Sequence, residues 1–325
     1  MAGSRIASQR REAEAAERRA RLLLYITIGV LAAVVVIVGI GLYITQYLPP
    51  RAHVATIAGQ DYNADDVAKR GSYYMIFEGG ALSRSVVGIA DVTIDLLAEQ
   101  AVVLQEAPAE VGEVTDADIE AALRERLGFD EGDPAFTDSL ADLIRTSGFD
   151  RDGYFQLVRA QVLGDRLSEQ FLEGLPTAAT QWHLERVRLT SRANAEALRD
   201  RVLAGESMDD VAQELASDPF ANLDIDWWPL DLLAGDVRDA VGALGEGDLS
   251  EPVQSGLFFD VYRAVEVESD RELTEDQRNN LASLELTDWI DEHRDNVEVT
   301  RDLSTSESDW IAERVLNDVQ EAIGG

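Results

Sequence analysis

The chain has 325 residues, no cysteine and a formal net charge of −34, from 62 acidic and 28 basic residues. So acidic a surface repels phosphate backbones, so we expect no nucleic acid partner, and the absence of cysteine excludes disulfides, thiol catalysis and Cys-ligated metal sites. The length suffices for a membrane anchor and two modest domains.

The N-terminus combines a basic tail with an uncharged apolar run. Residues 1–21 carry six Arg and three Glu, a net charge of +3, so the rest of the chain carries −37. The run Leu22–Thr45 holds 24 uncharged residues, which as a helix reach about 36 Å, enough for a hydrocarbon core of ~30 Å. The sequence therefore predicts a cytoplasmic tail over residues 1–21 and a transmembrane signal-anchor over residues 22–46.

A cleaved signal peptide is the alternative for this segment. Its apolar core would be shorter and a small-x-small cleavage site would follow it, whereas Gln-Tyr-Leu-Pro-Pro follows here. The arginines before the run place the N-terminus in the cytoplasm by the positive-inside rule. We therefore expect a single-pass protein of the cell membrane, with everything after Pro50 extracytoplasmic.

Residues 50–176 read as a mostly helical domain that begins with a short strand. VATIAG alternates as a strand does, with a turn at Gly59-Gln60, and Asn63, Thr115 and Asp150 are suited to cap helices. The segment resembles the N-terminal part of SurA-like and PrsA-like chaperones, whose V-A-x-V-N-G run precedes a helix. Ala58 stands at the Asn position. The resemblance implies a chaperone module that holds unfolded chains.

Residues 177–268 read as a small α+β unit with one sheet. WHLERVRL and FFDVYRAVE alternate as half-buried strands. Between them come an amphipathic helical stretch broken at Gly205, a loop with the Trp227-Trp228 pair, a short helix and a Gly/Pro turn. Two outer strands around helices predict a small separate domain.

The order of these pieces resembles the parvulin-type peptidyl-prolyl isomerase domain. ALRDRVLAGESMDDVAQELASD resembles the first two helices of that family, Asp226-Trp227-Trp228 stands where the family has Gly-Trp-Phe, and ALGEGDLSEPVQS resembles its Leu-x-x-Gly-x-(I/L)-Ser-x-Pro-Val-x-(T/S) segment. The resemblance implies a fold of one small sheet and a site that twists prolyl amides.

The residues that the resemblance assigns to the site depart from the family pattern. In parvulins two histidines lie at the pocket floor, and Arg186 and Asp260 stand at their positions here. Ser255 matches the family's Thr/Ser position. We expect Arg186 and Asp260 to form an ion pair, and we take Arg186, Asp260 and Ser255 as the candidate catalytic set.

A second set of residues is expected to line a substrate groove. Leu233 stands at the Met/Leu position of the family and Val237 at its Phe position, and Pro219 stands at its Cys/Asp position. For each apolar position the alternative is plain core packing. The candidate substrate-binding residues are Leu233, Val237, Trp227, Trp228, Phe258 and Phe259. The three histidines are too scattered to suggest a metal site, and we expect no cofactor.

The C-terminal segment contains two further helices. Thr274 is suited to cap TEDQRNNLASLELTDWIDEHRDNV, which resembles the helix after the parvulin domain in SurA-like proteins. The resemblance implies that residues 270–300 complete the module of residues 50–176, with the parvulin-like domain inserted. Residues 301–325 form an acidic extension with a short helix around Trp310, which we expect to cap the core, the alternatives being a partner contact or self-association.

The sequence thus predicts an α+β protein with a transmembrane helix, a SurA-like chaperone module and an inserted parvulin-like domain. The leading hypothesis is a membrane-anchored folding factor that binds unfolded or proline-containing polypeptides, with weak or no isomerase activity. One alternative is an active isomerase with a rebuilt pocket. Another is an adaptor that binds a membrane complex, such as the secretion channel, and no client.

Overall fold

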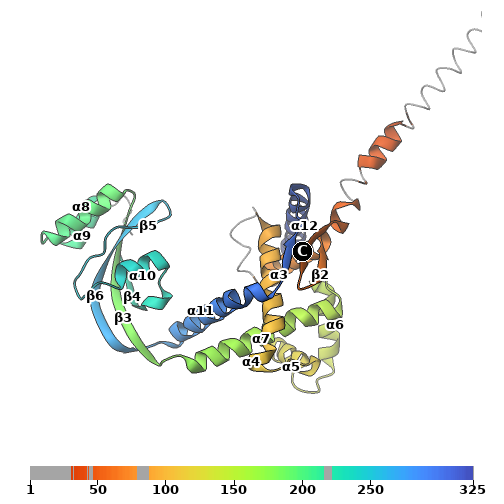
Figure 1. Ribbon diagram of the computed structural model, residues 1–325, viewed down its shortest axis with the longest axis horizontal. Helices are drawn as coiled ribbons and strands as arrows, with labels where there is room; N and C mark the ends of the chain where they lie inside the picture. The colour runs from red at the N-terminus through yellow and green to blue at the C-terminus, as the bar shows by residue number, and fades with distance from the viewer. Residues whose placement is uncertain are drawn as a thin grey trace, which may run out of the picture. The chain divides into compact units, whose positions relative to one another are not determined.

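The computed structural model describes Leu31, residues 33–41, Tyr43 and residues 47–78, 88–215 and 222–324. The chain divides into two compact units. Unit 1 comprises Met1–Gln105, Thr115–Ala160 and His293–Gly325, and unit 2 comprises Glu106–Val114 and Gln161–Glu292. Both units mix helices with a small sheet, so the predicted α+β class is confirmed (Figure 1).

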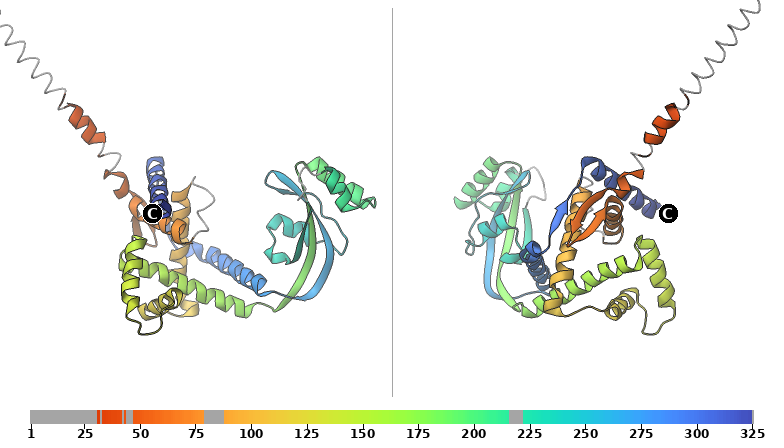
Figure 2. Two further views of the ribbon diagram at one scale, coloured as in Figure 1. Left: turned by 180° about the vertical axis from the view of Figure 1, so that it is seen from behind. Right: turned by 45° about the vertical axis from the view of Figure 1, so that its right-hand side comes forward.

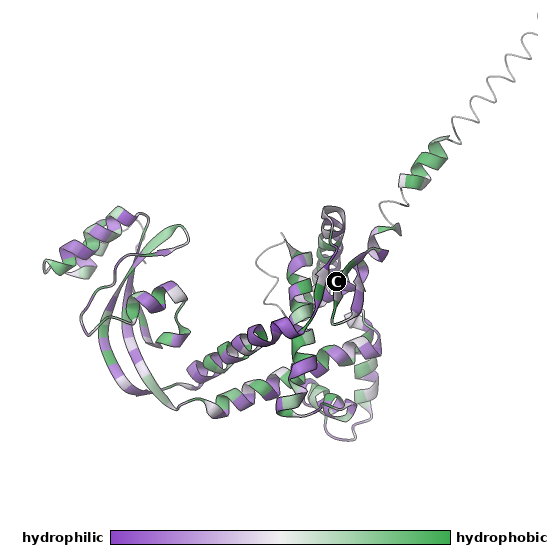
Figure 3. Ribbon diagram, in the orientation of Figure 1, coloured by the Kyte–Doolittle hydropathy of each residue, from purple (hydrophilic) through white to green (hydrophobic). Residues whose placement is uncertain are grey.

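The described part of the N-terminal apolar run is a short helix over residues 33–41. Its described side chains are all exposed, and hydrophobic residues make up almost the whole of it (Figure 3). Across the residues that the structure describes, no helix is long and apolar enough to cross a membrane. Much of the predicted span, residues 22–30, 32, 42 and 44–46, lies outside them.

Unit 1 contains a three-stranded antiparallel sheet in the order β2-β1-β7. β1 (His53–Ile57) and β2 (Gln60–Asn63) form a hairpin. The two turn residues, Ala58 and Gly59, both have positive φ, 51° and 77°, as a tight hairpin turn requires. β7 (Val299–Arg301) pairs with β1, so the sheet joins residues 53–63 to residues 299–301.

The helices of unit 1 begin at the predicted caps. Asn63 and Thr115 each form a capping box, with Asp66 and Asp118, and the Asp150 carboxylate accepts a hydrogen bond from the Gly153 N–H, 2.8 Å. Six helices belong wholly or partly to the described part of this unit: α2 (Ala64–Tyr73), α3 (Ile89–Glu106), α5 (Asp116–Leu127), α6 (Ala135–Ser147), the first half of α7 (Arg151–Gly174) and α12 (Thr305–Gly324).

The predicted short C-terminal helix is α12, 20 residues long, and it packs on α2. Ile311 and Val315 are fully buried. Gly71 of α2 permits the close approach, because a Cβ there would lie 3.1 Å from the Val315 side chain. The Ser72 hydroxyl donates a hydrogen bond to Asp318, 2.9 Å. The C-terminal extension therefore completes the core of unit 1, as the sequence suggested.

Unit 2 contains a four-stranded antiparallel sheet in the order β4-β3-β6-β5. Its two long central strands curve side by side (Figure 2). The four strands are β3 (Ala178–Leu189), β4 (Asn222–Pro229), β5 (Val253–Ser255) and β6 (Phe258–Glu272). The expectation of a loop at the Trp pair was wrong, because this segment is edge strand β4 and pairs with β3 through Trp182 and Trp228. Asp226 has a φ of 58°, and this irregularity removes the alternation that identifies a strand in sequence.

Helices cover both faces of this sheet (Figures 1 and 2). α8 (Arg192–Leu203) and α9 (Met208–Leu215) pack on one face, around Val187, Leu189 and Val261. α10 (Gly235–Val241) packs on the other, around Trp182, Leu184 and Tyr262. The predicted break at Gly205 is confirmed, since it separates α8 from α9 and has a φ of 102°.

α11 (Glu275–His293) follows the sheet and belongs to unit 2 together with the second part of α7 and the short helix α4 (Pro108–Val111). Thr274 caps α11 in a reciprocal pair with Gln277, as predicted. Trp289 is buried and its indole N–H donates to the Glu110 carboxylate, 2.7 Å. Leu284 of the same helix is 40% exposed.

Candidate functional site

The polar residues of the predicted isomerase site come from the two central strands of unit 2. Neighbouring side chains of a strand point to opposite faces of the sheet. Val187 and Leu189 point into the core under α8 and α9, so Arg186 and Arg188 project on the α10 face. On β6 the corresponding residues are Asp260 and Tyr262, which lie directly opposite Arg188 and Arg186.

Asp260 forms an ion pair with Arg188, and the expected pairing with Arg186 was wrong. The Arg188 guanidinium donates from Nε to Asp260 Oδ1, 2.8 Å, and from Nη2 to Oδ2, 2.7 Å. Strand register decides the choice, because Arg186 faces Tyr262 instead. The sequence showed that both arginines share a face, but it contains no signal for the register of β6.

The pair is strongly bound and half shielded from water. The Asp260 side chain is 1% exposed and the Arg188 side chain 34%. Two parallel hydrogen bonds from one guanidinium are the strongest form of such a pair, and the Asp260 carboxylate raises the pKa of Arg188 above its ordinary value. Because both Asp260 oxygens accept hydrogen bonds from the guanidinium, the carboxylate is not free to accept a proton from a substrate.

Ser255 and Phe258 lie beside the Arg188–Asp260 pair on the α10 face. Arg188 Nη2 also donates to Ser255 Oγ, 3.3 Å, and the guanidinium carbon lies 5.4 Å from the centre of the Phe258 ring. Ser255 and Phe258 are paired across the β5–β6 hairpin. Phe258 is 39% exposed, and Leu257 at the hairpin tip is 88% exposed. This tip presents apolar side chains beside the ion pair.

The predicted groove residues are divided between the two faces of the sheet. Leu233 and Val237 pack, partly buried, on the α10 core, so they lie on the same face as Arg188 and Asp260. Phe259 packs into the core of the opposite face with α8 and α9, which removes it from the candidate groove. Pro219 lies outside the described residues.

The tryptophan pair is held within the sheet, and neither member is exposed. The Trp227 ring stacks on His183, with 5.4 Å between ring centres, and on its other side the Arg271 guanidinium carbon lies 4.0 Å from the ring centre. The Trp228 indole N–H donates to the Ile225 carbonyl, 2.6 Å. Both therefore stabilise β4, and Trp227 faces away from the α10 core because it pairs with His183.

No imidazole stands on the α10 face among the described residues. His183 projects to the opposite face and pairs with the Asp224 carboxylate, 2.9 Å. A hydrogen bond from the Asp226 N–H, followed by the one from His183, holds the pKa of Asp224 below its usual value. His53 and His293 belong to unit 1.

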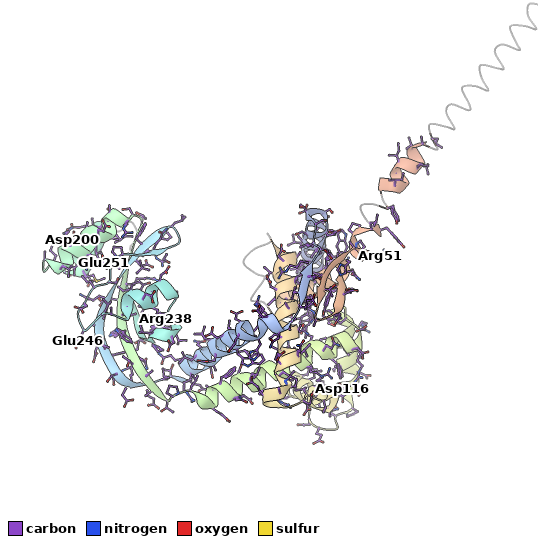
Figure 4. The ribbon with its side chains drawn as sticks, viewed as in Figure 1. Arg51, Asp116, Asp200, Arg238, Glu246 and Glu251 are labelled. Atoms are coloured by element: carbon purple, nitrogen blue, oxygen red, sulfur yellow. The ribbon has the colours of Figure 1, made fainter. Side chains whose placement is uncertain are left out.

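Sequence reasoning missed Arg188 and Tyr262 as members of this site. Burial raises the pKa of the Tyr262 hydroxyl, the Asp260 charge raises it further, and Arg186 and Arg188 oppose the shift. Other acidic residues of unit 2, such as Asp200, Glu246 and Glu251, are exposed (Figure 4). The site is therefore an apolar surface with a fixed ion pair, suited to holding a peptide side chain but without a mobile proton.

No family model matches the sequence, and no curated protein matches it either. The solved structures similar to this chain are PrsA-type and SurA-like chaperones and parvulin-type domains. This is the family that the sequence resembles. The structure of the peptidylprolyl isomerase PrsA from Bacillus anthracis is 12% identical, with a TM-score of 0.39, over 70% of this chain and 96% of that one.

Two further structures extend the comparison. A SurA-like chaperone structure from Campylobacter jejuni is 15% identical over 75% of this chain and 96% of that one, with a TM-score of 0.26. The parvulin of Nitrosopumilus maritimus is 19% identical over 26% of this chain and 95% of its own, with a TM-score of 0.23. Because these TM-scores lie below 0.5, the description of the site rests on the strand order and registers of this chain.

Proposed function

We propose that the chain is a membrane-anchored, extracytoplasmic protein-folding factor that binds unfolded or newly translocated polypeptides. Its chaperone module comprises residues 50–176 and 270–300, and its parvulin-like domain, residues 177–268, has little or no isomerase activity. The sequence resemblance of residues 54–176 and 274–299 to SurA-like chaperones supports this function. Unit 1 is likewise assembled from three separate stretches of chain, the last being His293–Gly325, whereas the second part of α7 and almost all of α11 group with unit 2.

The observation that carries the proposal on activity is the Arg188–Asp260 pair. Rotation about a prolyl amide needs no covalent chemistry, and an enzyme accelerates it by binding the twisted amide more tightly than the planar one. A guanidinium already bound twice to a carboxylate and once to Ser255 has little freedom to follow the amide as it twists. The Arg188–Asp260 pair therefore lacks a responsive polar group, and on the same face Arg186 Nε is a buried donor without a partner among the described residues.

The proposal of an anchor rests on the N-terminal run. Described residues 33–41 form a helix with every side chain exposed, which in water leaves a large apolar area unburied. The six arginines before the run favour a cytoplasmic N-terminus. The chain should remain in the membrane fraction after alkaline carbonate washing. Recovery of soluble protein lacking residues 1–48 would instead show that the run is a cleaved signal.

Two assays test the function itself. Full-length chain in detergent should suppress the aggregation of an unfolded model protein, followed by light scattering. In a protease-coupled prolyl assay it should give a rate close to that of the uncatalysed reaction. A rate typical of an active parvulin, lost on changing Ser255 or Leu233, would establish the active isomerase. If the chain does not suppress aggregation at any salt concentration, the adaptor hypothesis is favoured. Co-purification with a membrane complex would then identify its partner.

A further inference from the structure

Unit 1 contains a cleft that the predicted site does not include. Two cavities, of about 360 Å³ and about 220 Å³, share Gln60, Tyr62 and Gln156 in their linings, so they adjoin. The larger lies within the 300–1,000 Å³ that small-ligand sites typically occupy. All lining residues belong to unit 1, so this cleft is a property of one compact body.

The cleft is assembled from one face of each of several elements. Gln60 and Tyr62 alternate along β2 and so project on the same side. α3 contributes Leu97, Gln100, Ala101 and Leu104, whose spacing places them on one helical face. Side-chain amides therefore stand over an apolar floor. An amide side chain offers both a donor and an acceptor, which is the combination that a peptide backbone also presents.

Two buried polar atoms along the cleft have no hydrogen-bond partner within the described part of the chain. They are Nη1 of Arg70, which lines the smaller cavity, and Oε1 of Gln100, which lines the larger. Arg70 is only 7% exposed. Since buried polar groups are almost always paired, a donor and an acceptor left open along one cleft indicate a missing ligand with complementary groups.

The charges of the cleft favour a neutral ligand. Arg159, which lines the larger cavity, is paired with Asp116, 2.6 Å. Lys69, which lines the smaller cavity, is paired with Asp65, 2.8 Å. In the smaller cavity, Asp66 and Asp150 already accept hydrogen bonds from the backbone N–H groups of Asn63 and Gly153, 3.1 Å and 2.8 Å. Their oxygens are therefore directed to helix starts.

We propose that this cleft binds an extended, uncharged segment of polypeptide through its main chain. Arg70 donates to a carbonyl of the segment, Gln100 accepts from one of its N–H groups, and small apolar side chains contact Leu97, Ala101 and Leu104. Recognition of the main chain accepts many sequences, as a folding factor requires. The inference rests on the proposed function and gives it a location within unit 1.

The test measures binding of end-capped, fluorescein-labelled eight-residue peptides of Thr, Val and Ala to the full chain in detergent, by anisotropy. A shuffled peptide should bind as tightly as the original, and a peptide N-methylated at alternate residues should not bind. Arg70→Met and Gln100→Leu should each weaken binding about tenfold or more, because each removes a desolvated hydrogen bond. A benzophenone-bearing peptide should crosslink to residues 57–62 and 97–105.

Arg124→Met is the matched control. Arg124 also belongs to unit 1, also has a buried Nη1 without a partner among the described residues, and also stacks on a phenylalanine. Its guanidinium carbon lies 4.1 Å from the centre of the Phe136 ring, against 4.8 Å from Arg70 to Phe149. It lines neither cavity. This variant should bind the peptides as the unchanged chain does.

Several outcomes would overturn the inference. They are no binding of the original peptide, equal binding of the N-methylated peptide, unchanged binding in both cleft variants, or binding only of peptides with a free carboxylate. Failure of the proposed function is distinguishable. If aggregation is suppressed but both variants bind peptide normally, the cleft is wrong and the function stands. If peptide binds in the cleft without any suppression of aggregation, the function is wrong and the cleft stands.

Discussion

The two units each contain a shielded arginine over an aromatic ring, and the two arginines differ in their partners. Arg188 of unit 2 donates two hydrogen bonds to a buried carboxylate. Arg70 of unit 1 is more deeply buried, lies over Phe149, and has a terminal nitrogen without a partner among the described residues. Arg188 is electrostatically satisfied, whereas Arg70 keeps an unpaired donor within the described part of the chain, as does Arg186, at Nε, on the α10 face of unit 2.

This difference bears on which unit binds clients. A satisfied ion pair on a sheet holds two strands in register and leaves little for a substrate to gain. An unsatisfied buried donor costs stability, and a ligand that satisfies it recovers that cost on binding. Under the proposed function, we expect unit 1 to contribute more to client binding than unit 2.

The largest effect is expected at Arg188. Arg188→Met leaves the Asp260 carboxylate, 0% exposed, buried without its counter-charge, which should destabilise unit 2 by about 3–5 kcal/mol. Urea unfolding followed by tryptophan fluorescence measures this, since Trp182, Trp227 and Trp228 belong to the sheet. The double variant Arg188→Met with Asp260→Leu should recover most of the loss. A loss below about 1 kcal/mol in the single variant would show that the pair is not needed.

At Arg70 we expect a substitution to raise stability instead of lowering it. Arg70→Met removes a buried, unpaired donor while keeping the aliphatic contact with Phe149, so unit 1 should gain roughly 1–3 kcal/mol. The gain should accompany the loss of peptide binding. Differential scanning calorimetry of the full chain would show it as a higher transition temperature. Destabilisation by this variant would mean that Arg70 is a structural residue and would remove the contrast with Arg188.

The helix caps are where the two units should respond alike. Thr115 caps α5 of unit 1 and Thr274 caps α11 of unit 2, each in a reciprocal pair three residues apart. Replacing either threonine by Ala should cost about 1 kcal/mol. Serine at the same positions should cost little, because its hydroxyl also caps. Unequal costs measured by urea unfolding would show that the units differ in more than their arginines.

The smallest effect concerns two tyrosines. Burial raises the pKa of both Tyr62 and Tyr262 above the ordinary 10.0, and a neighbouring arginine opposes the rise in each, Arg70 for Tyr62 and chiefly Arg186 and Arg188 for Tyr262. Each tyrosine hydroxyl has a higher pKa in the folded chain than in the unfolded chain. Its contribution to stability is therefore fully present below pH 10 and is lost as the pH rises through the folded-state pKa. Arg70→Met should delay tyrosinate absorbance from Tyr62 only, whereas Arg188→Met should delay that from Tyr262 only. A shift of both by one variant would contradict the separation of the sites.

Local signals in the sequence predicted the helices well. Asn63, Thr115, Asp150 and Thr274 all cap helices, and Gly205 separates α8 from α9, because caps and breaks depend on a few adjacent residues. The irregular edge strand β4 and the three-residue strand β7 escaped prediction, since each is defined by a partner far along the chain. Periodicity does not encode such pairing.

The sequence predicts which face of β3 carries the candidate site, but it does not predict how β3 and β6 are aligned. The alternation of β3 places Arg186 and Arg188 together, yet only the pairing with β6 selects Arg188 for Asp260. The same limit applies to Phe258 and Phe259, of which only the first lies beside the ion pair. The cleft of unit 1 had no sequence signal, because its lining comes from five elements, β1, β2, α2, α3 and α7.

The most direct test of the account removes the parvulin-like domain and asks whether client binding survives. In the full-length chain, residues 178–268 are replaced by a short Gly/Ser linker, and the aggregation of an unfolded model protein is followed by light scattering beside the unchanged chain. The account predicts that the shortened chain retains most of the suppression, and that Arg70→Met removes it. Loss of suppression on removing the domain, with no effect of Arg70→Met, would place client binding in unit 2 and contradict the account.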